Sequence, residues 1–204
     1  CTQPLAGRTI TQVNRRLDAL GALLWLQVQP DVAADRVALL GWSHGGGTVL
    51  AADSARQPAV AAFRRGHNAS YFATAIAFYP SCTAYTRPDT YVPAAPLSIY
   101  IGIEDDWTPA APCVALGEAA VARGLPLMVN TYPGTYHDFD APVGRLRVRN
   151  DVPNGVNPGR GVTTAPNPEA RADAYARVRE ILRRTIGRVP DAPARRSGAG
   201  YFTP

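Results

Sequence analysis

The fold of this chain is decided by the stretch ALLGWSHGGG, residues 38–47. It contains the pattern G-x-S-x-G, with Gly41, Ser43 and Gly45 in the fixed places. A short apolar run of strand composition precedes the pattern, and the residues after it can begin a helix. A strand that turns sharply into a helix exposes the residue at the turn, so the Ser43 hydroxyl is expected at a helix N-terminus. The alternative, a Gly-rich turn with an incidental serine, is disfavoured by the strand before it and the helix after it.

With 204 residues, of which 46% are apolar and 18% charged, the chain has the size and composition of one globular α/β domain. No apolar run is long enough to span a membrane. All basic residues are Arg, and the formal net charge is +5, but they are scattered and form no aromatic-lined groove. The high arginine content is therefore attributed to codon bias, and nucleic-acid binding is not expected. It is typical of a bacterial-type soluble protein, cytoplasmic or exported.

Around this stretch, apolar runs alternate with helical patterns. Such alternation predicts a mostly parallel sheet flanked by helices. Residues 59–70 are expected to be a polar connection, and residues 150–167, rich in Pro, Gly and Asn, a long loop. Strands are expected at residues 36–41, 71–79, 97–101 and 127–132, and helices at 9–29, 44–55, 109–123 and from 168 onward.

The domain is expected to cover residues 1–187, with a loop insertion at 141–166. Residues 188–204 are rich in Pro, Ala, Arg and Gly and are expected to form a disordered tail.

The three cysteines, Cys1, Cys82 and Cys113, do not have the spacing of metal ligands. One disulfide can form among them, which would leave one thiol. The sequence predicts neither a metal nor an organic cofactor.

A serine nucleophile needs a base that takes its proton and an acid that orients the base. The segment GIEDDWTP, residues 102–109, offers three adjacent carboxylates directly after an expected strand. Asp105 is the preferred acid and Asp106 the reserve. One of these acids is also expected to cap the helix that begins near Pro109, and Asp106 is the preferred candidate for that role.

The base is expected in the loop after the following strand, where the segment TYHDFD places His137. His44 directly follows Ser43 and cannot easily bend back to it, so its expected role is to donate its backbone N–H to an oxyanion. His67 is interpreted as a surface histidine. A metal site at His137, Asp138 and Asp140 is a weak alternative, since no further His or Cys is near in the sequence.

Acyl transfer needs a second oxyanion donor, which normally comes from a loop much earlier in the chain. Only 42 residues precede Ser43, and they hold one expected helix and one expected strand. We therefore expect an N-terminally truncated domain that lacks the first strands of its sheet and the loop with the second donor.

The segments GWSHGG, GIEDDWTP and YHDF resemble those of the dienelactone hydrolase family, over about residues 8–186. The resemblance implies an α/β-hydrolase fold with Asp105 as the triad acid and His137 as the base. The namesake enzymes carry Cys at the nucleophile position, where this chain has Ser43. That departure indicates a broader ester hydrolase rather than a specific lactonase.

These observations predict a serine hydrolase that cleaves carboxylic esters or lactones of small molecules, with Ser43, His137 and Asp105 as its catalytic residues. The turn around Ser43 and the adjacent Asp105 and Asp106 also resemble those of the catalytic domain of prolyl-oligopeptidase-type peptidases. Such a peptidase is the first alternative. An inactive fragment or non-catalytic binding module is the second, because half of the oxyanion site is missing from the sequence.

Overall fold

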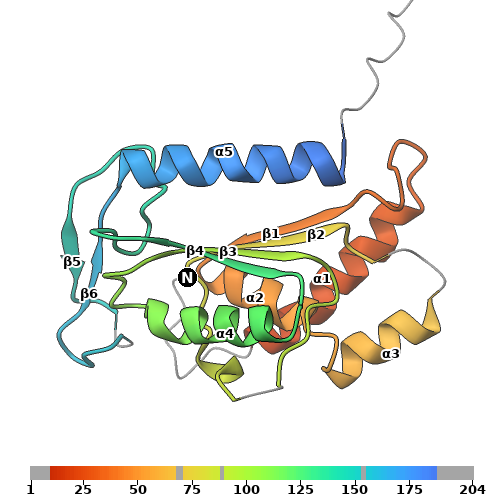
Figure 1. Ribbon diagram of the computed structural model, residues 1–204, viewed down its shortest axis with the longest axis horizontal. Helices are drawn as coiled ribbons and strands as arrows, with labels where there is room; N and C mark the ends of the chain where they lie inside the picture. Colours follow the sequence, from red (N-terminus) through yellow and green to blue (C-terminus); the bar gives the residue numbers. More distant parts are fainter. Residues whose placement is uncertain (1–9, 68–70, 88–89, 153–154, 188–204) are drawn as a thin grey trace, which may run out of the picture.

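The structure, a computed structural model, describes residues 10–67, 71–87, 90–152 and 155–187 (Figure 1). The predicted tail and Cys1 lie outside these residues. At the centre is a parallel sheet with the strand order β1-β2-β3-β4, which confirms the predicted fold class. Its strands are β1 Ala38–Trp42, β2 Thr74–Phe78, β3 Leu97–Gly102 and β4 Leu127–Tyr132.

The two inner strands, β2 and β3, are buried along their whole length. Their sequences are continuous apolar runs, as expected for strands that are covered on both faces. Phe78 and Tyr100 are stacked between these strands, with ring centroids 5.0 Å apart, in the larger of two hydrophobic clusters.

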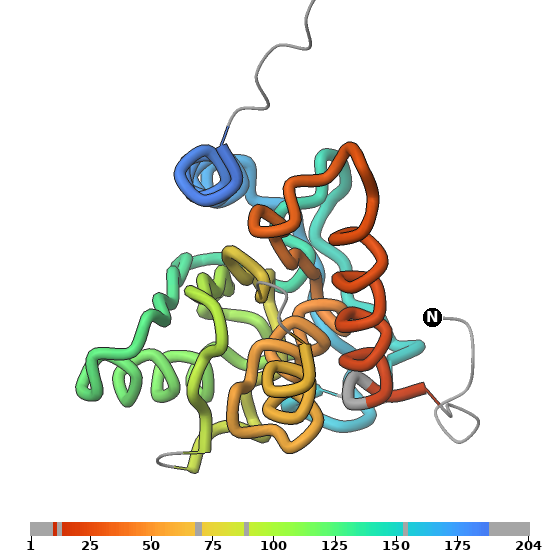
Figure 2. Tube along the Cα trace, turned by 90° about the vertical axis from the view of Figure 1, so that its right-hand side faces the viewer, coloured from red at the N-terminus to blue at the C-terminus, as the bar shows by residue number. Residues whose placement is uncertain are grey.

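Helices cover both faces of the sheet, with α5 on one face and α2 and α4 on the other (Figures 1 and 2). Helix α1 packs on α2. Helix α5 begins as predicted, because the Asn167 side chain accepts a hydrogen bond from the backbone N–H of Ala170 and Pro168 occupies the first turn. The helices are α1 Gln12–Gln27, α2 His44–Asp53, α3 Pro58–Gly66, α4 Ala110–Ala122 and α5 Pro168–Thr185.

Two predictions about irregular segments were wrong. Residues 58–66 form α3 rather than a polar connection, with Val60 buried and Phe63 packed against the smaller hydrophobic cluster. The expected long loop contains the strand β6 Val162–Thr164, which pairs antiparallel with β5 Arg147–Arg149. This small ribbon lies beyond the end of the main sheet (Figure 1).

A disulfide joins Cys82 and Cys113, the pairing that the sequence left open. Cys82 follows β2 and precedes the short helix η2 Thr83–Tyr85, while Cys113 lies in the first turn of α4. The bond therefore ties the loop after β2 to the helix that follows β3.

A buried carboxylate, Asp53, fixes the end of α2. Its side chain is fully buried and accepts a hydrogen bond from the backbone N–H of Ala95 at 2.8 Å. Burial is the main cause that raises the pKa of this carboxyl well above its ordinary value. At pH values between the ordinary pKa and this raised pKa, Asp53 is therefore protonated in the folded state and ionised in the unfolded state.

Asp53→Asn is expected to remove a pH-dependent loss of stability. Because the folded pKa is raised, the wild-type protein loses stability as the pH rises from about 4 towards that pKa, by about tenfold in the unfolding constant per pH unit. The variant has no such titration, so its stability relative to wild type should increase over the same range. Urea unfolding of both proteins at a series of pH values tests this, and a difference that is constant with pH would contradict it.

Candidate active site

Each of the four parallel strands ends at a residue of one cluster. Ser43 follows β1, Tyr79 follows β2, and Asp105 and His137 lie in the loops after β3 and β4. Parallel strands bring their carboxyl ends to the same edge of a sheet, so residues distant in sequence meet there.

Ser43 lies at the turn between β1 and α2 with φ 51° and ψ −114°, a left-handed conformation that is costly for a residue with a Cβ. Its backbone N–H donates to the carbonyl of Phe78 at 2.9 Å, which holds the turn against β2. A Cβ at Gly41 would lie 2.4 Å from the carbonyl oxygen of Gly45, and a Cβ at Gly46 would lie 2.8 Å from that of Phe78. Gly41 and Gly46 therefore allow the close approach.

Gly45, in contrast, has nothing within 4 Å of the position of a Cβ. Of the two glycines in the G-x-S-x-G pattern, Gly41 is thus required by sterics and Gly45 is not.

A continuous chain of hydrogen bonds joins the three residues that the sequence singled out. The Ser43 Oγ lies 2.9 Å from Nε2 of His137, and Nδ1 of His137 lies 2.7 Å from Oδ2 of Asp105. His137 is fully buried and Asp105 is 3% exposed, so water does not compete for the bond between them.

Asp105 is held by its own loop. Its Oδ1 accepts hydrogen bonds from the backbone N–H groups of Trp107 and Thr108, at 2.9 and 2.8 Å. The Thr108 hydroxyl lies within 3.1 Å of Asp105 Oδ2, His137 Nδ1 and the Tyr79 carbonyl. One oxygen of Asp105 is therefore used for position and the other faces the histidine.

Asp106 has a different role from the one expected. Its carboxylate accepts the backbone N–H of Thr163 at 2.7 Å and the Thr163 hydroxyl at 2.8 Å, so it anchors β6. It does not cap α4, whose N-cap residue is Pro109 and which has no side-chain capping bond. The two neighbouring acids thus serve two different segments.

The imidazole of His137 contacts two aromatic rings. The ring centroids of Tyr79 and Trp107 are 4.5 and 4.6 Å from it. The guanidinium of Arg149, on β5, lies 5.3 Å from the Trp107 ring centroid. Of the other two histidines, His44 directly follows Ser43 and is the first residue of α2. His67 is exposed, as expected for a surface residue, and its ring is stacked on Phe63.

A second carboxylate near His137, Asp140, is buried and bonded to aromatic donors. It accepts hydrogen bonds from the Tyr79 hydroxyl at 2.6 Å, the Trp42 indole at 2.7 Å and the Tyr175 hydroxyl at 3.0 Å. No local pattern in the sequence indicates this cluster, because its donors lie 35 to 98 residues away from Asp140.

Three residues other than glycine have positive φ in the described part of the chain: Ser43, Tyr79 at 37° and Asp138 at 58°. The last two contact His137 or neighbour it in sequence. Such strained conformations gather at functional sites, where the surrounding structure holds them.

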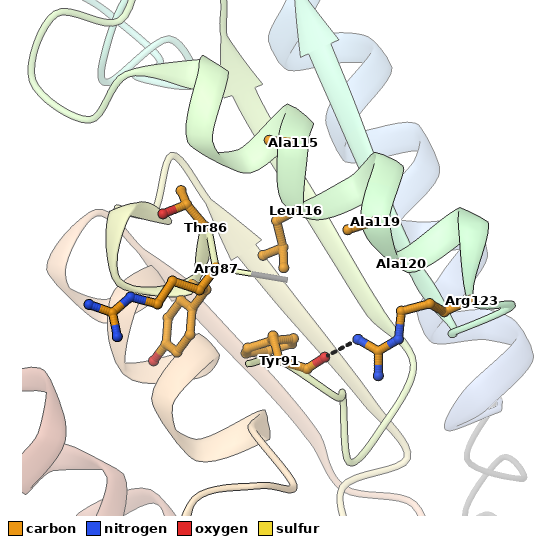
Figure 3. A pocket seen from close by; sticks show the side chains of 9 residues that line it. Thr86, Arg87, Tyr91, Ala115, Leu116, Ala119, Ala120 and Arg123 are labelled. Carbon is orange, nitrogen blue, oxygen red and sulfur yellow. Dashed lines mark hydrogen bonds between the residues drawn. The ribbon is translucent and has the colours of Figure 1, made fainter. Parts of the chain in front are cut away.

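A hollow of about 320 Å³ opens beside the loop that carries His137. It is lined by Asp138, by Ala141, Val143, Gly144, Arg145 and Arg147, and by residues 164–166. Its volume is in the range of small-molecule sites. A second hollow, between η2 and α4, encloses only about 20 Å³, which is room for a water or two (Figure 3). In this second hollow, the Arg123 guanidinium donates a hydrogen bond to the Tyr91 carbonyl.

The fold and the serine turn define the class of the α/β hydrolases. The family model of the dienelactone hydrolase family matches residues 3–186. The chain belongs to that family. No curated protein matches the sequence.

Solved structures of hydrolases have similar folds. A candidate dienelactone hydrolase from Klebsiella pneumoniae is 15% identical with a TM-score of 0.58, over 85% of this chain and 62% of that chain. A carboxylesterase from Lactobacillus plantarum is 15% identical, with a TM-score of 0.59, over 84% and 68%. Dipeptidyl peptidase 4 of Porphyromonas gingivalis is 18% identical, with a TM-score of 0.57, over 85% and 23%. This chain thus spans less than two thirds of the length of the first of these.

None of the described helices combines the length and the apolar character that crossing a bilayer requires.

Proposed function

We propose that this protein is a serine hydrolase that cleaves carboxylic esters or lactones through an acyl-enzyme intermediate. The observation that carries the proposal is the hydrogen-bonded chain from Ser43 through His137 to Asp105, at a strained turn between a strand and a helix. Membership of the dienelactone hydrolase family supports the same class of reaction.

In the first half of the reaction, the Ser43 Oγ attacks the carbonyl carbon while Nε2 of His137 takes the hydroxyl proton. Asp105 accepts the Nδ1–H, which fixes the tautomer that leaves Nε2 able to accept and stabilises the imidazolium that forms. The collapse of the tetrahedral intermediate breaks the bond to the leaving alkoxide, which receives the proton from His137.

In the second half, a water molecule attacks the acyl-Ser43 ester, and His137 takes one proton of that water and returns it to Ser43. In both halves, negative charge develops on the substrate oxygen. The backbone N–H of His44 is the proposed donor to that oxygen, since His44 directly follows the serine and begins α2.

The hollow beside the His137 loop is the proposed place of a small-molecule substrate. Its lining includes Asp138, which directly follows the base in sequence, and the two cations Arg145 and Arg147. No metal or organic cofactor enters the proposed reaction.

A fluorophosphonate probe tests the proposal, because such probes form a covalent bond with an activated serine. The expected result is one adduct, located on Ser43 by mass spectrometry of proteolytic peptides, and its prevention by prior unfolding of the protein. An adduct on another serine, or none on the folded protein, would contradict the proposal.

Substrate preference separates the ester hydrolase from its alternatives. An ester hydrolase is expected to cleave p-nitrophenyl esters of short acids faster than peptidyl anilides, and a peptidase the reverse. A non-catalytic binding module would turn over neither.

A further inference from the structure

The buried carboxylate of Asp140 joins three parts of the fold that meet at the site. It is 8% exposed, and no ion pair among the described residues includes it. Its carboxylate instead accepts hydrogen bonds from three neutral donors, which are the hydroxyls of Tyr79 and Tyr175 and the indole N–H of Trp42. A charge buried in this manner depends on all its hydrogen bonds.

Two of these donors adjoin the residues of the proposed reaction. Trp42 immediately precedes Ser43 and is stacked on Phe78 with ring centroids 5.4 Å apart. Tyr79 lies with its ring against the imidazole of His137. One oxygen of Asp140 thus binds Trp42, the residue before the proposed nucleophile, and the other binds Tyr79, whose ring contacts the proposed base.

The Tyr79 backbone is in a conformation that needs such support. Its φ of 37° is unfavourable for a tyrosine. Its N–H donates to the Tyr100 carbonyl, its carbonyl accepts from the Thr108 hydroxyl, and its own hydroxyl donates to Asp140. Burial and the bond to Asp140 also raise the pKa of Tyr79, so this hydroxyl remains a donor at any pH at which the protein is assayed.

We propose that Asp140 is a positioning residue for Ser43 and His137. Its carboxylate holds Tyr79 against the face of the imidazole and Trp42 behind the serine. It thereby sets the distance over which the serine proton passes to Nε2. The inference rests on the proposed function, since the distance matters only if that proton is transferred.

Asn is a mild replacement at this position. Its oxygen can accept from the Trp42 indole and the Tyr175 hydroxyl, while its NH₂ donates to the Tyr79 hydroxyl, which rotates and accepts. Asp140→Ala, in contrast, removes every acceptor and leaves both Tyr79 and Trp42 without their support.

The experiment compares ester hydrolysis by the wild-type protein, Asp140→Ala and Tyr79→Phe. Asp140→Ala is expected to lower kcat about 10- to 100-fold, and Tyr79→Phe about tenfold, with KM changed less than about threefold, because a misplaced reacting pair slows the chemistry rather than substrate binding. The rate of reaction of Ser43 with the fluorophosphonate probe should fall by the same factors.

Matched controls separate positioning from a general loss of stability. Asp53→Asn removes another buried carboxylate, and Tyr132→Phe removes another tyrosine–carboxylate hydrogen bond, to Asp173 at 2.8 Å. Both are expected to keep kcat within about twofold of wild type.

The outcomes are distinct. A kcat of Tyr79→Phe within twofold of wild type, in a protein whose Ser43 is labelled, would overturn the role of Asp140 and leave the proposed function intact. A similar loss of kcat in both control variants would also overturn it, because the effect would then be general. If Asp140→Ala does not fold, Tyr79→Phe decides alone, since it removes one hydroxyl. A wild-type protein without an adduct on Ser43 would overturn the function and this inference together.

Discussion

Asp105→Asn is expected to lower kcat about 10⁴-fold, the loss that the equivalent substitution causes in a serine protease triad. The structure gives a specific reason. Oδ1 of Asp105 accepts two backbone N–H groups, so the single oxygen of Asn will occupy that place. Its NH₂ then faces Nδ1 of His137, which must become an acceptor, and the ring proton moves to Nε2. A histidine in that tautomer cannot take the proton of Ser43.

Asp106→Asn is the matched control for this prediction. Its two oxygens bind only the N–H and the hydroxyl of Thr163. An Asn can keep the first bond through its oxygen and donate the second from its NH₂ to the hydroxyl. We expect a loss of kcat below tenfold, measured on the same ester at the same pH. If Asp106→Asn had the larger effect, the acid would have to be reassigned to Asp106.

Gly41→Ala is expected to destabilise the fold by about 3 kcal/mol, at the upper end of the usual overpacking penalty. The added methyl group would lie 2.4 Å from a backbone oxygen and 2.9 Å from a Val49 methyl. The backbone oxygen belongs to Gly45 and cannot move away without opening the turn that holds Ser43. Thermal unfolding followed by circular dichroism should show a decrease in Tm of about 10 °C.

Gly45→Ala tests whether this effect is steric. It places the same methyl group four residues away, inside α2 and in open space. Because Ala favours helices over Gly by up to about 1 kcal/mol, the stability of this variant should equal or exceed that of wild type. Equal destabilisation by both substitutions would show that the close approach at Gly41 is not the cause.

The sequence was informative wherever local pattern and strand order decide the structure. Apolar runs predicted β2 and β3 to within three residues at each end, because buried parallel strands require such runs. The bounds of β4, a partly exposed edge strand, were also predicted. The order serine, acid, histidine, each directly after a strand, predicted that Ser43, Asp105 and His137 meet at one sheet edge. The structure places them within hydrogen-bonding distance.

Contacts that depend on side-chain direction could not be predicted in this way. Nothing in the segment GIEDDWTP distinguishes Asp105 from Asp106; the difference arises because the loop turns one carboxylate inward and the other towards Thr163. The donors to Asp140 come from β1, the end of β2 and α5, and each is an ordinary aromatic residue in its own segment. Helix α3 was missed although apolar residues fill its first turns after Pro58, because the segment is short and is followed by polar residues and Gly66.

The hydrogen bonds of this site also span long stretches of chain. Ser43 and His137 are 94 residues apart, and Trp42 and Asp140 are 98 apart. Closing such large loops costs chain entropy that the contacts at their ends must repay. The segment up to the end of β2 contains the serine turn and three of the described helices, but neither His137 nor Asp105. The proposed activity therefore requires every strand from β1 to β4, and a measurement of that activity reports a complete sheet rather than the presence of helices.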